Sequence, residues 1–420
     1  MKLKLLSVML VGSGLFLTAC GGSDDKSDNF STSSNADINK IQNPVVSTPV
    51  PYKYTEDYPP NAAESVVMTY KMKGINGQET QATALVFTPK TAPPAGGWPI
   101  VVWAHGTKGV ADHCAPSRNY LITDGGNAPD EHTHKMIDSF VKDGYVVVAP
   151  DYEGLGEPSE KEIHPFLNLK SEAYSITDAV VATKNWLGNK ASNKWAVAGH
   201  SQGGHAALGA AQYAARANMD YKGAVAIAPA NNVELIEKLS EMVLADRTGL
   251  IQMGGYAALD SFTAYMAAGI KAANPTAPIY SIVFKSPTDK IAEFAESRCL
   301  EGLNLRFVSP MVTYRGKNNG SLVGYPRKNE GYANNPLVRK FLDKDSAPLQ
   351  PLIKTPIIIY QGGKDLTVLP QATDALVARA RALTTKIDYR TNSSWDHTGA
   401  FKENVENGQL MEDVKTLLAN

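Results

Sequence analysis

The stretch 195–205 constrains the fold of this chain more than any other part of the sequence. An apolar run at 196–198 predicts a short buried strand, and it leads directly into a G-x-S-x-G pattern formed by Gly199, Ser201 and Gly203. The alanine-rich residues that follow predict a helix. In this context of strand, sharp turn and helix, the pattern holds a strained, nucleophilic serine. Glycines suit the flanking positions because side chains there would clash where strand and helix approach each other.

The pattern by itself is weak, because G-x-S-x-G should arise by chance in about one chain in ten of this length. The apolar run before it and the helix after it favour a nucleophile over a chance match. We therefore predict that Ser201 is the catalytic nucleophile. Serine attacks poorly at neutral pH, so it needs a base and a third group that orients the base.

The base and the acid should follow the serine in the order acid, then histidine, each in a loop after a core strand. His397 follows the apolar segment 386–391 and is the only histidine after His205, so we predict that it is the base. Asp365 follows the apolar segment 355–360 and is predicted to be the acid.

Two other aspartates are alternatives for the acid. Asp396 adjoins the predicted base, but neighbours in sequence rarely face each other well enough to pair in this way. Asp374 lies within a helical pattern instead of a loop after a strand. Asp365 is preferred because of its position after the strand.

An oxyanion hole needs two backbone N–H groups directed at the developing negative charge. One should come from the residue after the nucleophile, Gln202, and the other from the loop after the first parallel strand. In that loop Gly106 permits a close approach, and we predict Thr107 as the donor, with His105 and Gly106 as alternatives.

Continuous apolar runs alternate with helical patterns along most of the chain. Strands are predicted at 98–105, 145–150, 196–198, 222–229, 355–360 and 386–391, and helices at 130–143, 173–187, 204–215, 368–384 and near 403–419. Such runs indicate a mostly parallel sheet that is buried on both faces. An antiparallel hairpin is predicted before them, from strands at 64–72 and 79–89. The predicted fold class is α/β, a mostly parallel central sheet with flanking helices.

One block, at about 231–352, interrupts this alternation with helical patterns and loops but no convincing core strand. It lies between two core strands, so we predict a helical cap inserted over the carboxyl edge of the sheet, where open α/β sheets bind ligands. Such a cap could shape a substrate pocket or act as a lid, and the alternative is that it only thickens the fold.

The N-terminus predicts export. A basic start, an apolar stretch at 5–18 and small residues before Cys20 indicate a signal peptide over 1–19. Cysteine after this L-x-A pattern resembles the lipobox of bacterial lipoproteins, which implies lipidation of Cys20 and, with Gly-Gly-Ser following, an outer-membrane anchor. The alternative is a plain secretory signal. Residues 20–61 are rich in Ser, Asp, Asn and Pro and predict a flexible tether, which leaves 62–420 as the folded domain.

Cys114 and Cys299 remain as a potential pair, because an oxidising compartment permits a disulfide, although two separate buried thiols are the alternative. The other histidines are expected to pack, bond locally or lie on the surface. One group of residues in and after the long loop could suggest a metal site: Asp130, His113, His132 and His134. Their spacing is not that of a ligand set, so no metal is predicted.

Four motifs together resemble the secretory lipase family of α/β hydrolases, the group related to fungal lipase A. They are Trp103-Ala-His-Gly-Thr107, Ala111-Asp-His-Cys-Ala-Pro-Ser117, Pro150-Asp-Tyr-Glu-Gly154 and Gly199-His-Ser-Gln-Gly-Gly204. The resemblance runs from about residue 52 to the end of the chain. It implies an α/β-hydrolase fold with a mostly parallel central sheet, a triad of Ser201, Asp365 and His397, a Cys114–Cys299 disulfide and a helical cap.

The resemblance also implies hydrolysis of carboxylic esters, including triacylglycerols, and the triad chemistry predicts no cofactor. A peptidase or amidase with the same triad, and a surface-binding lipoprotein that has lost catalysis, are the alternatives. The formal net charge of −1 and the absence of a basic block argue against nucleic acid as a partner. The predicted partners are an ester or lipid substrate and, through the anchor, a membrane.

Overall fold

The computed structural model describes residues 37–52, 59–118, 131–159 and 162–419. The predicted signal peptide, Cys20 and the first part of the predicted tether lie outside the described residues, as does Asp130. Within the described ranges, no helix combines the length and the apolar character needed to cross a membrane.

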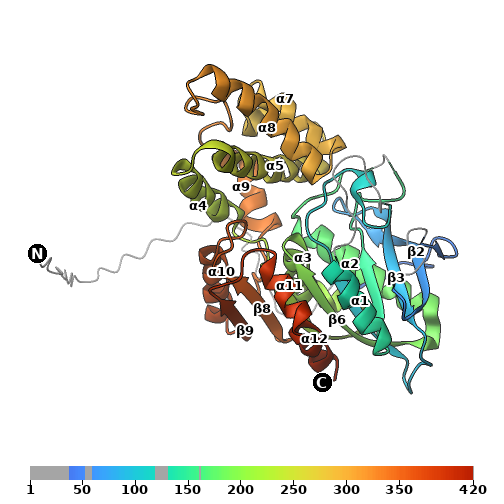
Figure 1. Ribbon diagram of the computed structural model, residues 1–420. Helices are drawn as coiled ribbons and strands as arrows, with labels where there is room; N and C mark the ends of the chain where they lie inside the picture. Colours follow the sequence, from blue (N-terminus) through green and yellow to red (C-terminus); the bar gives the residue numbers. More distant parts are fainter. Residues whose placement is uncertain (1–36, 53–58, 119–130, 160–161, 420) are drawn as a thin grey trace, which may run out of the picture. The chain divides into compact units, whose positions relative to one another are not determined.

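Nine strands form one sheet in the order β1-β2-β3-β5-β4-β6-β7-β8-β9 (Figure 1). The strands are β1 (Val50–Pro51), β2 (Ala62–Lys73), β3 (Glu79–Pro89), β4 (Trp98–Ala104), β5 (Val146–Pro150), β6 (Ala191–His200), β7 (Asp220–Ile227), β8 (Ile357–Gly362) and β9 (Ile387–Asn392). The six strands from β5 to β9 in this order run parallel, whereas β1, β2 and β3 pair antiparallel. The predicted α/β-hydrolase fold and its N-terminal hairpin are confirmed.

The parallel strands are continuous apolar runs because helices cover both faces of the sheet. The helices of the sheet region are α1 (Glu131–Lys142), α2 (Leu169–Leu187), α3 (Gln202–Tyr213), α10 (Pro370–Ala382), α11 (Gly399–Glu406) and α12 (Gln409–Ala419). Helices α2, α3 and α10 share one buried core with the sheet, and α1, α11 and α12 share the other. On β6, Val197 contributes to the first core, whereas its neighbours Ala196 and Ala198 contribute to the second.

Helix ends differ from the predictions where capping and glycine decide them. α2 begins at Leu169, before the predicted start, because the Asn168 side chain accepts from the N–H of Ser171 at 3.1 Å. The single C-terminal helix predicted near 403–419 is wrong: Gly408, with a φ of 81°, separates α11 from α12.

Residues 37–52 are not the flexible tether that their composition predicts. The Asn39 side chain donates to Asp178 at 2.8 Å, and its backbone N–H donates to the carbonyl oxygen of Arg216. Asp178 and Arg216 form a buried ion pair with a 2.7 Å contact, and β1 adds a short strand to the edge of the sheet. Hydrogen bonds to buried residues hold this segment on the domain, and amino-acid composition alone cannot predict such contacts.

A helical cap occupies the chain between β7 and β8. Its helices are α4 (Val233–Ala245), α5 (Gly249–Ala273), α6 (Ile279–Val283), α7 (Thr288–Ala292), α8 (Leu300–Lys317) and α9 (Pro336–Lys340). They enclose a hydrophobic core that includes Tyr265, Phe284 and Phe307, and Phe166 and Leu167 from the loop before α2 also pack into it. In Figure 1 the cap helices gather apart from the strands.

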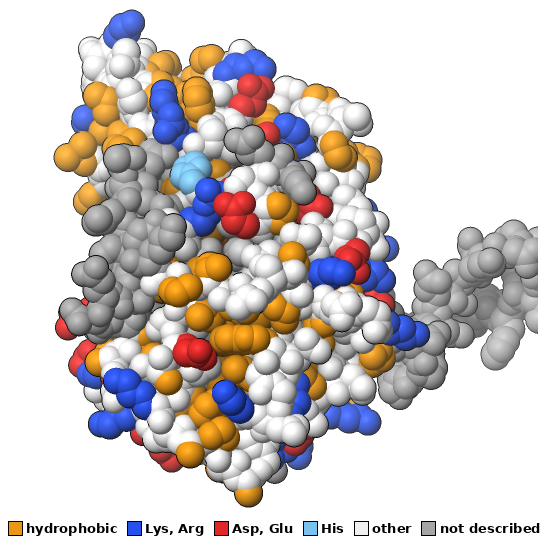
Figure 2. All heavy atoms as spheres, turned by 90° about the vertical axis from the view of Figure 1, so that its right-hand side faces the viewer, with side chains coloured by type: hydrophobic (Ala, Val, Ile, Leu, Met, Phe, Trp, Pro, Cys, Tyr) orange, Lys and Arg blue, Asp and Glu red, His pale blue; other side chains and the backbone are white. Residues whose placement is uncertain are grey.

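Figure 2 shows one face of the molecule, on which basic and acidic side chains are interspersed.

A disulfide between Cys114 and Cys299 joins the loop after β4 to the start of α8. Beside it, the N–H of Leu300 donates to the carbonyl oxygen of Lys108 at 2.9 Å. The chain itself passes between the sheet region and the cap at two crossings, after β7 and before β8. The disulfide joins residues 185 positions apart and so connects the cap to the sheet region at a further place.

Candidate active site

Ser201 lies at the apex of the turn between β6 and α3. Its φ of 59° and ψ of −116° are angles that a residue with a side chain adopts only under strain. Its N–H donates to the carbonyl oxygen of Ile227 at 2.9 Å, and its carbonyl oxygen accepts from the N–H of Ala230 at 3.1 Å. These bonds to the end of β7 and the segment after it hold the strained turn at the carboxyl edge of the sheet.

The glycines of the motif are required by close contacts between strand and helix. A Cβ at Gly199 would lie 2.1 Å from the carbonyl oxygen of Gly203. A Cβ at Gly203 would lie 1.9 Å from the carbonyl oxygen of Ala104. Backbone atoms cannot give way at such distances, so any larger residue at either position would displace the turn that holds Ser201.

Asp365 and His397 lie together in the loops after β8 and β9. His397 Nδ1 lies 2.8 Å from Asp365 Oδ2, and the other carboxylate oxygen accepts the N–H groups of Thr367 and Val368, each at 2.8 Å. Asp365 is 1% exposed, so these bonds fix its orientation. Because Nδ1 donates to Asp365, the Nε2 atom of His397 is left as the proton acceptor.

Ser201 and His397 line one cavity of about 350 Å³. Among the described residues no hydrogen bond joins their side chains, and catalytic hydrogen bonds are often long without substrate. The alternative acids are used elsewhere: Asp396 accepts the N–H of Gly399 at 2.7 Å, and Asp374 accepts from the hydroxyl of Tyr389. The structure therefore brings Asp365, and neither alternative, against the predicted base.

His200 supports the loop that carries His397. Its Nε2 lies 2.8 Å from the carbonyl oxygen of His397, and the two rings lie 4.7 Å apart. Phe401 of α11 also stacks on the His200 ring, with ring centres 5.7 Å apart. The sequence places His200 beside the nucleophile, but nothing in its spacing indicates this contact with the histidine loop.

The loop at 105–107 passes directly beside the serine. A Cβ at Gly106 would lie 3.7 Å from the Cβ of Ser201, and Thr107 lines the same cavities as Ser201. The His105 ring lies 2.7 Å from the carbonyl oxygen of Gly106, and burial lowers its pKa to about 4. Gln202 is the first residue of α3, so its N–H has no partner inside the helix. Both predicted oxyanion donors thus border the serine.

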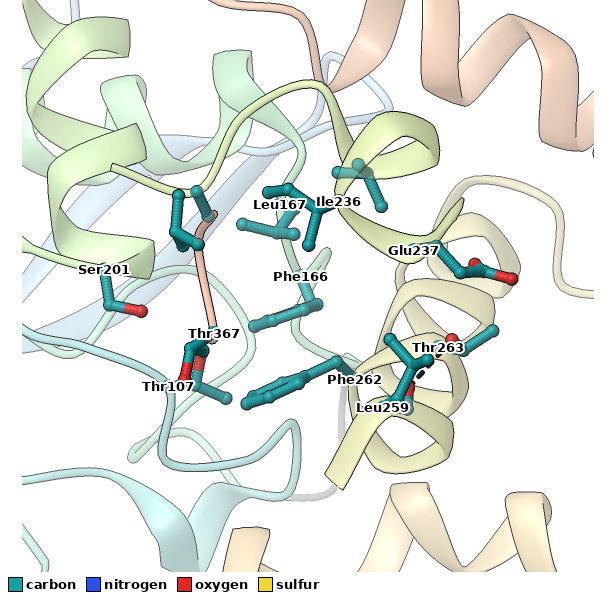
Figure 3. A pocket seen from close by; sticks show the side chains of 13 residues that line it. Thr107, Phe166, Leu167, Ser201, Ile236, Glu237, Leu259, Phe262, Thr263 and Thr367 are labelled. Carbon is teal, nitrogen blue, oxygen red and sulfur yellow. Dashed lines mark hydrogen bonds between the residues drawn. The ribbon is translucent and has the colours of Figure 1, made fainter. Parts of the chain in front are cut away.

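A second, narrower cavity of about 80 Å³ lies between Ser201 and the cap. Figure 3 shows the Ser201 side chain directed toward the space bordered by Phe166, Leu167 and Phe262. Phe262 and Thr367 line both cavities together with Ser201. The serine therefore lies where two compartments meet, and apolar side chains make up most of the lining of both.

The proposed loop histidines are not brought together. His132 lies 3.4 Å from Glu406 of α11. Across the described ranges, the one group of three potential metal ligands combines His113 with the two cysteines of the disulfide. Sulfur atoms in a disulfide are not thiolate ligands, so this group does not present a usual metal site.

Glu153, behind the site, should make stability depend on pH. Burial raises its pKa to about 7, so between pH 4.5 and 7 the folded state binds more protons than the unfolded state. The contribution of this group to the free energy of unfolding is therefore largest at low pH. It falls by about 3 kcal/mol as the pH rises through 7. We expect Glu153→Gln to be more stable relative to the parent at pH 8 than at pH 5.

Urea unfolding at both pH values measures this difference. The amide of Glu153→Gln can still accept from the N–H of Ile75 and donate to Ser171. Exposed Glu64→Gln is the control and should leave the pH dependence unchanged. Equal pH dependence in the parent and Glu153→Gln would contradict the prediction.

The sheet order, the strained serine turn and the acid and histidine after the last two strands define an α/β hydrolase by fold. The chain belongs to the serine aminopeptidase, S33, family, whose model matches residues 116–392. The matched region contains Ser201 and Asp365 and ends before His397. No curated protein sequence matches the chain.

Solved structures with this fold include lipases and esterases. Lipase A from Candida antarctica in its closed state has a TM-score of 0.64 at 18% identity, over 88% of this chain and 83% of that chain. The rice cell wall degrading esterase LipA from Xanthomonas oryzae has 0.60 at 19%, over 84% and 91%. A putative hydrolase from Legionella pneumophila has 0.61 at 17%, over 83% and 89%. The predicted resemblance to fungal lipase A is confirmed at the level of the fold.

Proposed function

We propose that the protein is a serine carboxylic-ester hydrolase that acts on acylglycerols or other lipid esters through an acyl-enzyme intermediate. The observation that carries the proposal is the Asp365–His397 bond of 2.8 Å in the cavity that the strained Ser201 also lines. A strained serine, a histidine with a fixed tautomer and a buried acid are the parts that acyl transfer requires.

In this mechanism Ser201 Oγ attacks the ester carbonyl carbon while His397 Nε2 takes the hydroxyl proton. The carbonyl oxygen becomes negative and accepts the backbone N–H groups of Gln202 and Thr107. Collapse of this intermediate breaks the ester bond, and His397 gives its proton to the departing alcohol. Water then attacks the acyl-enzyme by the same route and releases the carboxylic acid.

The lining of the narrow cavity supports an apolar acyl group. Its side chains between Ser201 and the cap are largely hydrocarbon (Figure 3): Phe166, Leu167, Val233, Ile236, Leu259 and Phe262. Burying an alkyl chain there gains about 0.8 kcal/mol for each methylene group. This gain favours fatty acyl esters. The one acidic residue among the described residues of the lining, Glu237, is paired with Lys328 at 2.8 Å.

A peptidase is the second candidate, because the matching family is described as a serine aminopeptidase. The two activities separate on matched substrates: p-nitrophenyl esters of graded acyl length, and aminoacyl p-nitroanilides. For the esterase we expect kcat/KM on the best ester to exceed that on the best anilide by at least about 100-fold, or about 2.7 kcal/mol. The reverse order would replace our proposal with the peptidase.

The non-catalytic alternative is tested with a fluorophosphonate probe, which reacts only with an activated serine. We expect labelling of Ser201 and of no other serine. A folded protein that neither turns over esters nor takes up the probe would contradict the proposed function.

A further inference from the structure

A cluster of buried polar side chains lies behind the nucleophile turn, and the mechanism above uses none of these side chains. It contains Glu172 of α2, His164 of the loop before α2, and Gln202 and His205 of α3, all of them buried. Buried polar groups are costly unless they are fully bonded, so a cluster of this kind fixes the position of each member.

The side chain of Gln202 is held by both of its N–H groups. Its Nε2 lies 2.8 Å from Glu172 Oε1 and 2.8 Å from His164 Nε2. His164 Nδ1 lies 2.8 Å from the carbonyl oxygen of Glu153, which can only accept. Nδ1 therefore carries the proton, and Nε2 is free to accept from Gln202. Burial lowers the pKa of His164, which keeps that lone pair available.

The orientation of the Gln202 amide follows from these partners. A reversed amide would direct its oxygen at a carboxylate and would lose both hydrogen bonds. Its Oε1 is buried without a partner among the described residues, so the two donor bonds alone hold this side chain.

Glu172 is itself fixed from three directions. Its Oε1 also accepts the N–H of Leu167 at 3.1 Å, and its Oε2 lies 2.6 Å from His205 Nδ1. His205 Nε2 donates to the carbonyl oxygen of Ser346, at the return from the cap. With acceptors at both ends, His205 and Glu172 must hold a proton between them.

The same cluster also contacts the loop on the other side of the oxyanion hole, through Tyr152. The Tyr152 ring stacks on His164, with ring centres 5.7 Å apart, and lies tilted against His105 at 4.4 Å. Its hydroxyl donates to the carbonyl oxygen of His105 at 3.0 Å. His105 begins the loop that carries Thr107. The segments of both oxyanion donors are thus braced by one buried group of side chains.

We propose that Glu172 and His164 are positioning residues for the oxyanion hole, acting through the side chain of Gln202. Gln202 supplies a backbone N–H to the reacting carbonyl oxygen, and its tethered side chain prevents the first turn of α3 from rotating that N–H away. The proposal rests on the proposed acyl-transfer function. It concerns stabilisation of the transition state and predicts little effect on ground-state binding.

Gln202→Met tests this directly, because it keeps the length and removes both tethers. We expect kcat to fall by about 10- to 100-fold, with KM changed by less than about 3-fold, since complete loss of one oxyanion donor costs about 10²–10³. The inhibition constant of a trifluoromethyl ketone, which adds to serine and forms an oxyanion, should rise in parallel. Gln212→Met on the same helix is the control.

Variants of Glu172 keep the test decisive if Gln202→Met fails to fold. The amide of Glu172→Gln can still accept hydrogen bonds from Gln202 and Leu167, and it can donate one to His205. The side chain of Glu172→Leu can make none of these hydrogen bonds. We expect Glu172→Gln to retain at least about 10-fold more kcat than Glu172→Leu. Parental kcat and ketone inhibition in Gln202→Met, or equal losses in both Glu172 variants, would overturn the proposal.

The parent enzyme separates this proposal from the proposed function. Failure of the parent to hydrolyse any ester counts against the ester-hydrolase function. Failure of the positioning role appears instead as variant-to-parent ratios close to one in an active enzyme, whichever acyl substrate is used.

Discussion

Replacing Ser201 with alanine is expected to lower kcat/KM for p-nitrophenyl butyrate by on the order of 10⁴-fold. The variant loses the attacking oxygen, while the oxyanion donors and both cavities remain. Steady-state kinetics of the purified parent and variant measure the change. Fluorophosphonate labelling should disappear in the variant.

The expected loss is specific to chemistry, so the fold should be retained. Circular dichroism and the melting temperature check this; alanine keeps the Cβ atom, so the backbone strain of the turn is unchanged and the variant should melt close to the parent. Ser297→Ala, on the exposed surface, is the matched control. Parental activity in Ser201→Ala would exclude this serine as the nucleophile.

Replacing Asp365 with asparagine should be almost as damaging, by on the order of 10⁴-fold in kcat. Asp365 Oδ1 accepts two backbone N–H groups, from Thr367 and Val368, so the asparagine oxygen should occupy that position. Its NH₂ group would then face His397 Nδ1 and donate to it. His397 would carry its proton on Nε2, which is the tautomer that cannot accept a proton from Ser201.

Asp396→Asn is the control that separates position in the chain from position in space. Asp396 adjoins His397 but is exposed, and it binds the N–H of Gly399. The amide oxygen of asparagine can accept the N–H of Gly399 as the carboxylate does, so kcat should change by less than about 3-fold. A large loss in Asp396→Asn with little loss in Asp365→Asn would reverse the assignment of the acid.

The alternation of apolar runs and helical patterns predicts the sheet well because burial on both faces leaves a strong local signal. Chain ends and connections were less predictable. The polar segment 37–52 packs on the domain through Asp178 and Arg216, which lie far away in sequence. The break at Gly408 depends on a single left-handed residue within an otherwise helical pattern.

At the site, the strand-to-loop order leads to Asp365 and His397, because parallel strands bring their carboxyl ends to one edge. The supporting residues leave no such signal. Glu172 lies directly before the helix predicted at 173–187, and His164 lies in the connection before it, where no catalytic pattern is present. Their role depends on three-dimensional contacts with Gln202, at separations of 30 and 38 residues. Such pairs cannot be identified from spacing in one sequence.

The Cys114–Cys299 bond has a mechanical consequence for access to the serine. Hydrogen bonds hold both ends of the cap near the nucleophile turn. Ala230, where the chain enters the cap, bonds to Ser201, and Ser346, where the chain leaves it, bonds to His205. Two chain crossings alone would leave the cap able to rotate about the line that joins them. The disulfide adds a covalent attachment on the loop after β4, beside the hydrogen bond between Leu300 and Lys108, and opposes that rotation. We therefore expect substrates to enter through movement of individual cap helices, and reduction of the disulfide to loosen the connection between the cap and this loop.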